Sequence, residues 1–181
     1  DGRGSGRSGG RRGHTPSPAE FLADLAAAAA ALRATLERAG AAGAPLHVLA
    51  NCFGTRIVLP WLAQHRGVFR SVILTAPGTH MTRRASYGLW QRVSILLSPA
   101  ERYFPTPLRD DDFVRSGAWL EWIRADALAL RRVTAGFLRS AAALTRPTRA
   151  AIAQLRLPLL VVLGCRDLLV DNQAIREHLV G

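Results

Sequence analysis

Three short apolar runs limit the kinds of sheet that this chain of 181 residues can form. They span residues 46–49, 71–75 and 159–163, and their apolar residues are continuous rather than alternating. Continuous apolar strands are typical of parallel sheets, whose strands are buried on both faces. A helical pattern separates the first two runs, a long helical region precedes the third, and a helix follows it. The order predicts an α/β protein with a parallel sheet flanked by helices.

The helices are predicted from residues typical of helix N-termini and from the spacing of apolar residues. A helix over 18–39 is predicted to begin with Ser17 as its cap, Pro18 in its first turn and Glu20 reaching back to the cap. Helical patterns also cover 53–65 and 172–180, whereas 80–156 has no strand pattern and contains amphipathic helices at 87–97, 118–124 and 127–144. We therefore expect residues 1–79 and 157–181 to form the core of the domain and 80–156 to form a helical insertion.

A tight turn joins the first predicted strand to its helix, with the sequence Ala50-Asn51-Cys52-Phe53-Gly54. The small Ala50 and Gly54 are expected to let strand and helix pass closely, while Cys52 projects at the helix N-terminus. The free N–H groups there favour a thiolate, and the Phe53 N–H is positioned to bind an oxyanion. The pattern matches the nucleophile elbow G-x-S-x-G with two substitutions, Ala for Gly and Cys for Ser. The alternative interpretation is an inert, buried cysteine at a strand end.

Several further stretches carry a resemblance to a known family. They are "DGRGSGRSGGRRGH", the following "FLADL" with Asp24, "WLEWIRADALALRRVTAGFL" and "LPLLVVLGCRDLLVDN". In this order they resemble the α/β-hydrolase superfamily, and within it the serine aminopeptidase S33 and lysophospholipase (monoacylglycerol lipase-like) branch. The resemblance implies a partial α/β-hydrolase fold in which 80–156 is a cap. It also implies that Asp167 is the acid of a catalytic triad, in preference to Asp171, which is expected to cap the last helix.

The base of the triad has no obvious counterpart in the chain. A triad histidine follows the acid in this fold, and the only later histidine, His178, lies on the predicted last helix and is expected not to reach the site. His14 matches a histidine of the family that has a structural role. We therefore expect the chain to be part of a longer protein that supplies the histidine, and to be inactive alone.

The expected substrate pocket lies under the cap. His80, in the loop that leads into the cap, and the cap tryptophans Trp90, Trp119 and Trp122 are predicted to line it. The expected function is hydrolysis of a small acyl ester or thioester, lipid-like in character, through a Cys52 acyl-enzyme. Two alternatives remain open, namely an acyltransferase that uses the same cysteine and a non-catalytic binding protein with the same fold.

Composition excludes other classes. The net charge is +11, but the 24 basic residues are all arginine and are scattered. The densest run, "GRGSGRSGGRR", is short and has no interleaved aromatic residues, which indicates compositional bias rather than nucleic-acid binding. Cys52 and Cys165 are too few for a disulfide framework, which favours a reducing, cytoplasmic location. Histidines and cysteines lack the spacing of a metal site, and no cofactor motif is present. The longest apolar run, 157–165, is about half of the ~20 residues that span a membrane.

Overall fold

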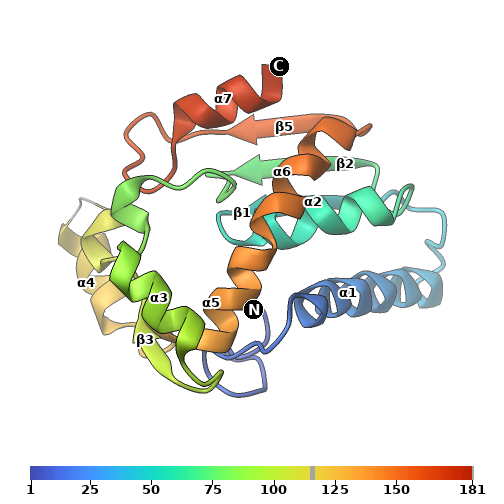
Figure 1. Ribbon diagram of the computed structural model, residues 1–181. Helices are drawn as coiled ribbons and strands as arrows, with labels where there is room; N and C mark the ends of the chain where they lie inside the picture. Colours follow the sequence, from blue (N-terminus) through green and yellow to red (C-terminus); the bar gives the residue numbers. More distant parts are fainter. Residues whose placement is uncertain (115–116, 181) are drawn as a thin grey trace.

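A computed structural model describes residues 1–114 and 117–180 of the chain (Figure 1). Three parallel strands form the main sheet in the order β1-β2-β5, and helices pack around it. The predicted α/β class and parallel sheet are confirmed, and the architecture is that of a partial α/β-hydrolase fold. The main elements are α1 (Pro18–Arg38), β1 (His47–Asn51), α2 (Gly54–Gln64), β2 (Ser71–Thr75), β5 (Leu159–Val162) and α7 (Asn172–Val180).

Register in the sheet brings the ends of all three strands to one edge. Leu49 of β1 lies opposite Ile73 of β2, which lies opposite Leu160 of β5. Because the strands are parallel, the turns that follow β1 and β5 emerge on the same side of the sheet. The arrowheads of β2 and β5 in Figure 1 point toward the segment inserted between them.

The expectation that each strand is buried on both faces is wrong, because even in β2 buried residues alternate with half-buried ones. Leu49 is 63% exposed and Leu160 is 56% exposed, whereas Val72 and Leu74 of β2 are buried. Leu49, Ile73 and Leu160 share one register row and point to one face of the sheet, whereas Val72 and Leu74 point to the face that packs on the main core. Apolar residues of β1 and β5 are therefore exposed in this chain, although their sequence pattern predicts burial.

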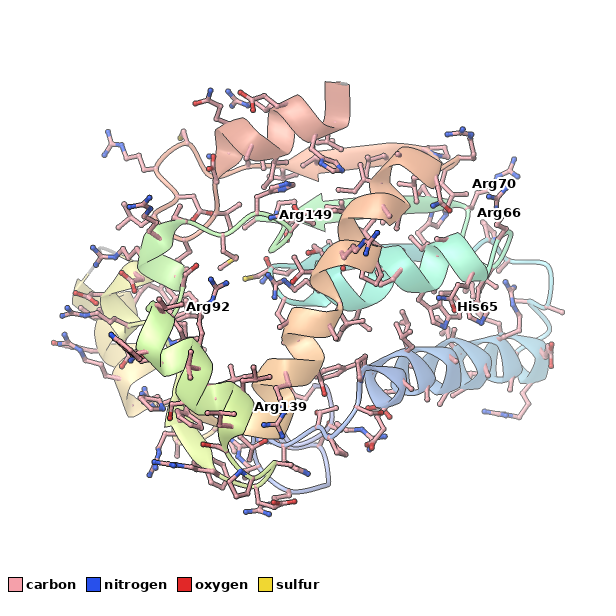
Figure 2. The ribbon with its side chains drawn as sticks, in the orientation of Figure 1. His65, Arg66, Arg70, Arg92, Arg139 and Arg149 are labelled. Carbon is pink, nitrogen blue, oxygen red and sulfur yellow. The ribbon has the colours of Figure 1, made fainter. Side chains whose placement is uncertain are left out.

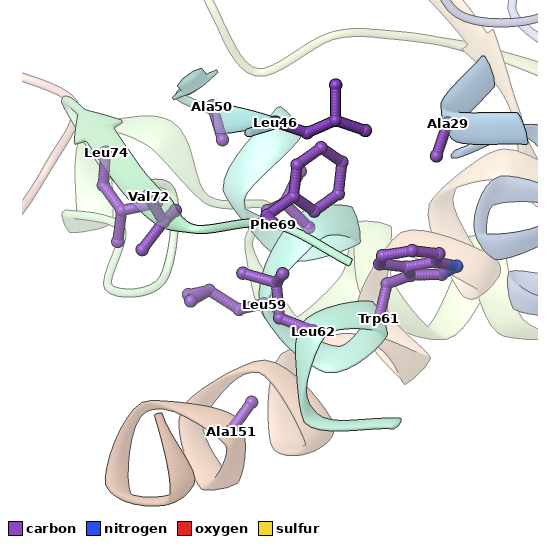
Figure 3. Close-up of a cluster of buried hydrophobic side chains, with 11 residues drawn as sticks. Ala29, Leu46, Ala50, Leu59, Trp61, Leu62, Phe69, Val72, Leu74 and Ala151 are labelled. Atoms are coloured by element: carbon purple, nitrogen blue, oxygen red, sulfur yellow. The ribbon is translucent and has the colours of Figure 1, made fainter. Parts of the chain in front are cut away.

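One hydrophobic core holds the sheet to α1, α2 and α6 (Figure 3). Leu59 and Trp61 of α2 lie in this core with Leu74 of β2, and Ala29 of α1 packs at its edge. Ala151 of α6 closes it from the other side. Fully burying a leucine side chain contributes about 1.5–3 kcal/mol, so this cluster is what fixes α2 beneath the strands.

The first helix begins where predicted but by other contacts. Ser17 occupies the N-cap position and Pro18 begins the helix, yet the Ser17 side chain makes no capping hydrogen bond. Glu20 does not reach back to the cap and instead pairs with Arg3. The Arg3 guanidinium also binds Asp24 through two hydrogen bonds of 2.7 Å, which holds the glycine-rich loop 1–14 against α1.

The inserted segment is not purely helical, which corrects the sequence-based prediction. Residues 103–105 and 132–134 pair as an antiparallel hairpin, and the helix predicted over 127–144 begins only at Ala135. The reason is local, because Val133 and Thr134 are β-branched and Thr134 caps the helix by accepting from the Phe137 N–H. Its elements are η1 (Arg83–Ala85), α3 (Leu89–Leu97), β3 (Tyr103–Pro105), η2 (Asp110–Asp112), α4 (Gly117–Ala125), β4 (Arg132–Thr134), α5 (Ala135–Ala143) and α6 (Thr145–Gln154).

The last of these helices belongs to the core by its packing. Helix α6 lies within the range 80–156 that was expected to form the cap, yet it packs on α2 and places Ala151 in the main core. Figure 1 shows α3, α4 and β3 gathered beyond the carboxyl ends of the strands, away from α6.

Candidate active site

The turn after β1 has the backbone of a nucleophile elbow. Cys52 has φ 44°, in the left-handed region that non-glycine residues rarely adopt. Its N–H donates to Thr75 O (3.0 Å), and its carbonyl accepts from the N–H of Thr55 (3.1 Å) at the start of α2. These bonds hold Cys52 at the apex between strand and helix, as the five-residue pattern predicts.

The glycine that lies against the backbone of the elbow is Gly78, which was not predicted from the sequence. A Cβ added at Gly54 would meet no atom of the structure within 4 Å, so the room expected from Gly54 is not used within this chain. A Cβ added at Gly78 would lie 2.9 Å from the carbonyl oxygen of Cys52. Gly78 follows β2 in "APG", and its proximity depends on the pairing of β1 with β2. Ala50 is buried, with 3% of its surface exposed.

The Cys52 thiol is half-buried and protonated at neutral pH. Burial raises the pKa of this thiol above its ordinary value, and the Asp167 carboxylate raises it further. The Phe53 N–H donates to the sulfur and the Arg56 guanidinium lies near it. Both lower the pKa of the thiol, but the net shift remains upward. Attack by this cysteine therefore requires a base.

Asp167 lies after β5, at the same edge of the sheet as Cys52. Its carboxylate Oδ1 accepts from the N–H groups of Leu169 (2.8 Å) and Val170 (2.9 Å), which orients it in the turn. Asp171 accepts from the Ala174 N–H (3.0 Å) and caps α7, as expected from the sequence, and Asp167 as the acid stays a prediction.

No histidine in the described residues is hydrogen-bonded to Asp167. His178 on α7 is bonded to the Arg149 carbonyl (2.9 Å). His14 is bonded to the Thr134 hydroxyl (3.0 Å) and joins the N-terminal loop to the hairpin, a structural role.

A large apolar cavity of about 610 Å³ opens at the elbow. Cys52 and Phe53 form part of its wall, and the insertion supplies most of the remainder. Phe53 also packs on Phe137 of α5 with ring centroids 5.3 Å apart, and both contact Phe21 of α1. Residues that line the cavity include Cys52, Phe53, Arg56, Tyr87, Leu108 and Phe137.

The prediction that three cap tryptophans line the pocket is wrong. Trp90, Trp119 and Trp122 are 81%, 62% and 64% exposed and lie outside the cavity lining. On α3 the cavity is lined by Arg92, Ile95 and Leu96 rather than by Trp90, and none of the residues of α4 lines it.

His80 also lies outside the lining. It packs against His178 with ring centroids 5.2 Å apart, and burial, Arg149 and His178 lower its pKa.

Tyr87 lines the cavity, although it was not among the residues predicted to do so. Its hydroxyl donates to the Pro105 carbonyl (2.7 Å), and burial raises its pKa to about 12, so it remains neutral.

Within the described residues, no group of three or more histidine, cysteine or acidic side chains is arranged to hold a metal ion. Both cysteines are free thiols. No helix in residues 1–114 and 117–180 combines the length and apolarity needed to cross a membrane.

Comparison with solved structures supports the fold. The chain is similar to a monoacylglycerol lipase of Paleococcus ferrophilus, with a TM-score of 0.81 and 15% identity over 98% of this chain and 65% of that one. It is similar to a soluble variant of monoglyceride lipase from Saccharomyces cerevisiae, with a TM-score of 0.79 and 17% identity over 98% of this chain and 61% of that one. A deformylase from Pseudomonas putida S16 has a TM-score of 0.56 and 19% identity, over 99% of this chain and 67% of that one.

The chain thus spans less than two thirds of the length of either lipase. No curated protein matches it. A family profile described as serine aminopeptidase, S33, matches residues 1–180, in agreement with the elbow, the acid turn and the parallel sheet. The chain therefore belongs to the serine aminopeptidase S33 family, within the α/β-hydrolase superfamily.

Proposed function

We propose that the protein carrying this chain is a carboxylic ester hydrolase that acts on a lipid-like acyl ester or thioester through an acyl-enzyme on Cys52. The observation that carries the proposal is the strained elbow at Cys52, which opens directly into a cavity of about 610 Å³ with mainly apolar walls. An apolar cavity with a nucleophile at its wall suits an acyl chain whose carbonyl reaches the sulfur.

The chemistry follows from the groups at the elbow. A base removes the thiol proton, the sulfur forms a bond to the acyl carbon, and the Phe53 N–H stabilises the charge on the carbonyl oxygen. Collapse of this intermediate expels the alkoxide or thiolate, which takes the proton back from the base. Water, activated by the same base, then attacks the acyl carbon and releases the carboxylic acid and the Cys52 thiol.

The base in this proposal is a histidine from sequence outside the chain, oriented by Asp167. The position of Asp167 supports this assignment, because its carboxylate is held by two backbone N–H groups at the edge of the sheet where Cys52 lies. An acid fixed in this way stabilises an imidazolium without itself accepting the proton.

The part of the insertion that precedes α6 is proposed to be the cap over the site. Its support is that η1, α3, the β3–β4 hairpin and α5 all contribute to the cavity wall opposite Cys52. The proposed substrate is a small molecule. The two free thiols support a reducing location such as the cytoplasm.

The test uses the full-length protein, an activated octanoyl ester and intact-mass measurement under native conditions. A single octanoyl adduct is expected on the protein and on Cys165→Ala, which removes only the exposed thiol, and is expected to be absent from Cys52→Ala. Steady release of octanoate would then establish the hydrolase.

Two results would redirect the proposal. Transfer of the octanoyl group to an added thiol or amine in preference to water would indicate an acyltransferase. A folded protein that forms no adduct and shows no turnover would contradict the enzyme proposal and leave a binding protein.

A further inference from the structure

Arg56 places a positive charge in the wall of the cavity, one helical turn after Cys52. Its guanidinium is partly buried, and it donates from Nε to the Gly78 carbonyl (2.7 Å) and from Nη1 to the Ala141 carbonyl (3.4 Å). Both acceptors are neutral backbone groups. Among the described residues Arg56 forms no ion pair with a carboxylate.

The surroundings add positive charge rather than balance it. Arg92 and Arg139 also line the cavity, and none of the lining residues is acidic. Burial and the nearby Arg149 lower the pKa of Arg56, yet a guanidinium remains charged at neutral pH. Withdrawing a charge from water without a counter-charge is costly, so an anion that enters the cavity gains from meeting this group.

The three cavity arginines differ in their surroundings and in their position relative to Cys52. Arg139 directs one nitrogen at the carbonyls of Ile95 (2.9 Å) and Ser98 (2.8 Å), at the end of α3, where it serves as a structural cap. Arg92 is exposed on α3, on the side of the cavity formed by the insertion (Figure 2). Only Arg56 combines partial burial, proximity to the Cys52 sulfur and donors without a charged partner among the described residues.

The Cys52 thiol does not supply the missing negative charge. It is a neutral group at pH 7, as its burial and the Asp167 carboxylate require. In the resting site, Arg56 therefore faces an uncharged nucleophile and an apolar cavity.

We propose that Arg56 binds a carboxylate on the substrate, a few bonds from the scissile carbonyl, so that the site selects acyl groups carrying a negative charge. The proposal rests on the proposed function in taking the cavity at Cys52 as the substrate site. A guanidinium fixed at Nε by Gly78 and at Nη1 by Ala141 leaves Nη2 and the second N–H of Nη1 for a carboxylate, which it binds in a planar, charge-assisted geometry. Substrates of this class are half-esters of short dicarboxylic acids.

The test measures binding rather than turnover, with full-length Cys52→Ala and two matched probes. Monobutyl glutarate carries a carboxylate, and butyl glutaramate has an uncharged amide of the same shape in its place. Isothermal titration is expected to give 10- to 100-fold tighter binding of the charged probe, the range for a hydrogen bond to a charged group. Equal affinity for the two probes would overturn the proposal.

Substitutions of Arg56 then test whether this residue causes the preference for the charged probe. Added to Cys52→Ala, Arg56→Met should abolish the preference for the charged probe, while Arg56→Lys keeps the charge and should retain much of it. The matched control is Arg66→Met, which removes the same charge from the loop that follows α2, outside the cavity (Figure 2), and should leave both affinities unchanged. A melting curve establishes folding for each variant.

Other outcomes are equally decisive. A preference that survives Arg56→Met in a folded protein, or one lost only in Arg92→Met, overturns the assignment. If Arg56→Met does not fold, Arg56→Lys and Arg92→Met decide together. A preference that is weakened by Arg56→Lys and unchanged by Arg92→Met supports the assignment, and the reverse overturns it. Because binding needs no turnover, failure of the acyl-adduct experiment leaves this result intact, and the two proposals fail separately.

Discussion

The N–H of Gly78 donates to the carbonyl of Cys52 at 3.1 Å and to the Thr55 hydroxyl at 3.0 Å. The loop after β2 is thereby bonded to the apex of the elbow after β1. The strained backbone of Cys52 is held by a neighbouring strand as well as by its own helix, which is how a conformation that costs of order 1–3 kcal/mol persists.

Replacement of Gly78 by alanine should disrupt the elbow. The added Cβ would lie 2.9 Å from the Cys52 carbonyl oxygen, closer than van der Waals contact allows, so loop and elbow must separate. We expect Gly78→Ala to destabilise the protein by about 1–3 kcal/mol. Urea denaturation measures this loss. The control is Gly54→Ala, where an added Cβ meets nothing within 4 Å and stability should change by less than about 1 kcal/mol. Equal losses in both variants would refute this explanation.

Alkylation of Cys52 should be slow at neutral pH and accelerate only in alkaline solution. Its pKa is raised by burial and by Asp167, so the reactive thiolate is scarce below the ordinary thiol pKa, and the rate rises as pH passes above that value. Iodoacetamide labelling from pH 6 to 10, followed by peptide mass spectrometry, gives the rate profile. The exposed Cys165 serves as the internal reference. Faster labelling of Cys52 than of Cys165 at pH 6–7 would contradict this description.

Asp167→Asn should change turnover and thiol reactivity in opposite directions. The amide keeps an oxygen that can accept from Leu169 and Val170, so the turn should remain folded. Loss of the carboxylate lowers the pKa of Cys52 and speeds alkylation at a given pH. Ester turnover by the full-length enzyme should fall by about 10⁴-fold, as when a triad acid becomes an amide. Unchanged turnover would remove Asp167 from the proposed mechanism.

Asp24→Asn should loosen the N-terminal loop in a pH-dependent way. The Arg3 guanidinium lowers the pKa of Asp24 below its ordinary 3.8, so the pair stabilises the fold above that pH. The contribution is lost as pH falls through the lowered value. Both side chains are more than one third exposed, so we expect only about 0.5–1 kcal/mol at pH 6. Thermal melting of wild type and variant should differ at pH 6 and converge near pH 2; an equal difference at both would rule out the ionic contribution.

The sequence by itself determined the local features of this protein. Apolar runs marked the three strands, Pro18 and Asp171 marked the helix starts that the structure contains, and the five residues around Cys52 specified a strained turn. These features depend on backbone preferences and on the spacing of apolar residues, and a few consecutive residues determine both.

Only the tertiary structure decided which side chains meet at the site. The alternation of apolar and polar residues in α3 and α4 did not reveal that Trp90, Trp119 and Trp122 face outward. The contact of Gly78 with Cys52 arises from the pairing of β1 with β2. The place of Arg56 in the cavity depends on Gly78 and Ala141, which lie 22 and 85 residues away in the chain. Such contacts follow from packing between distant segments, and no local pattern encodes them.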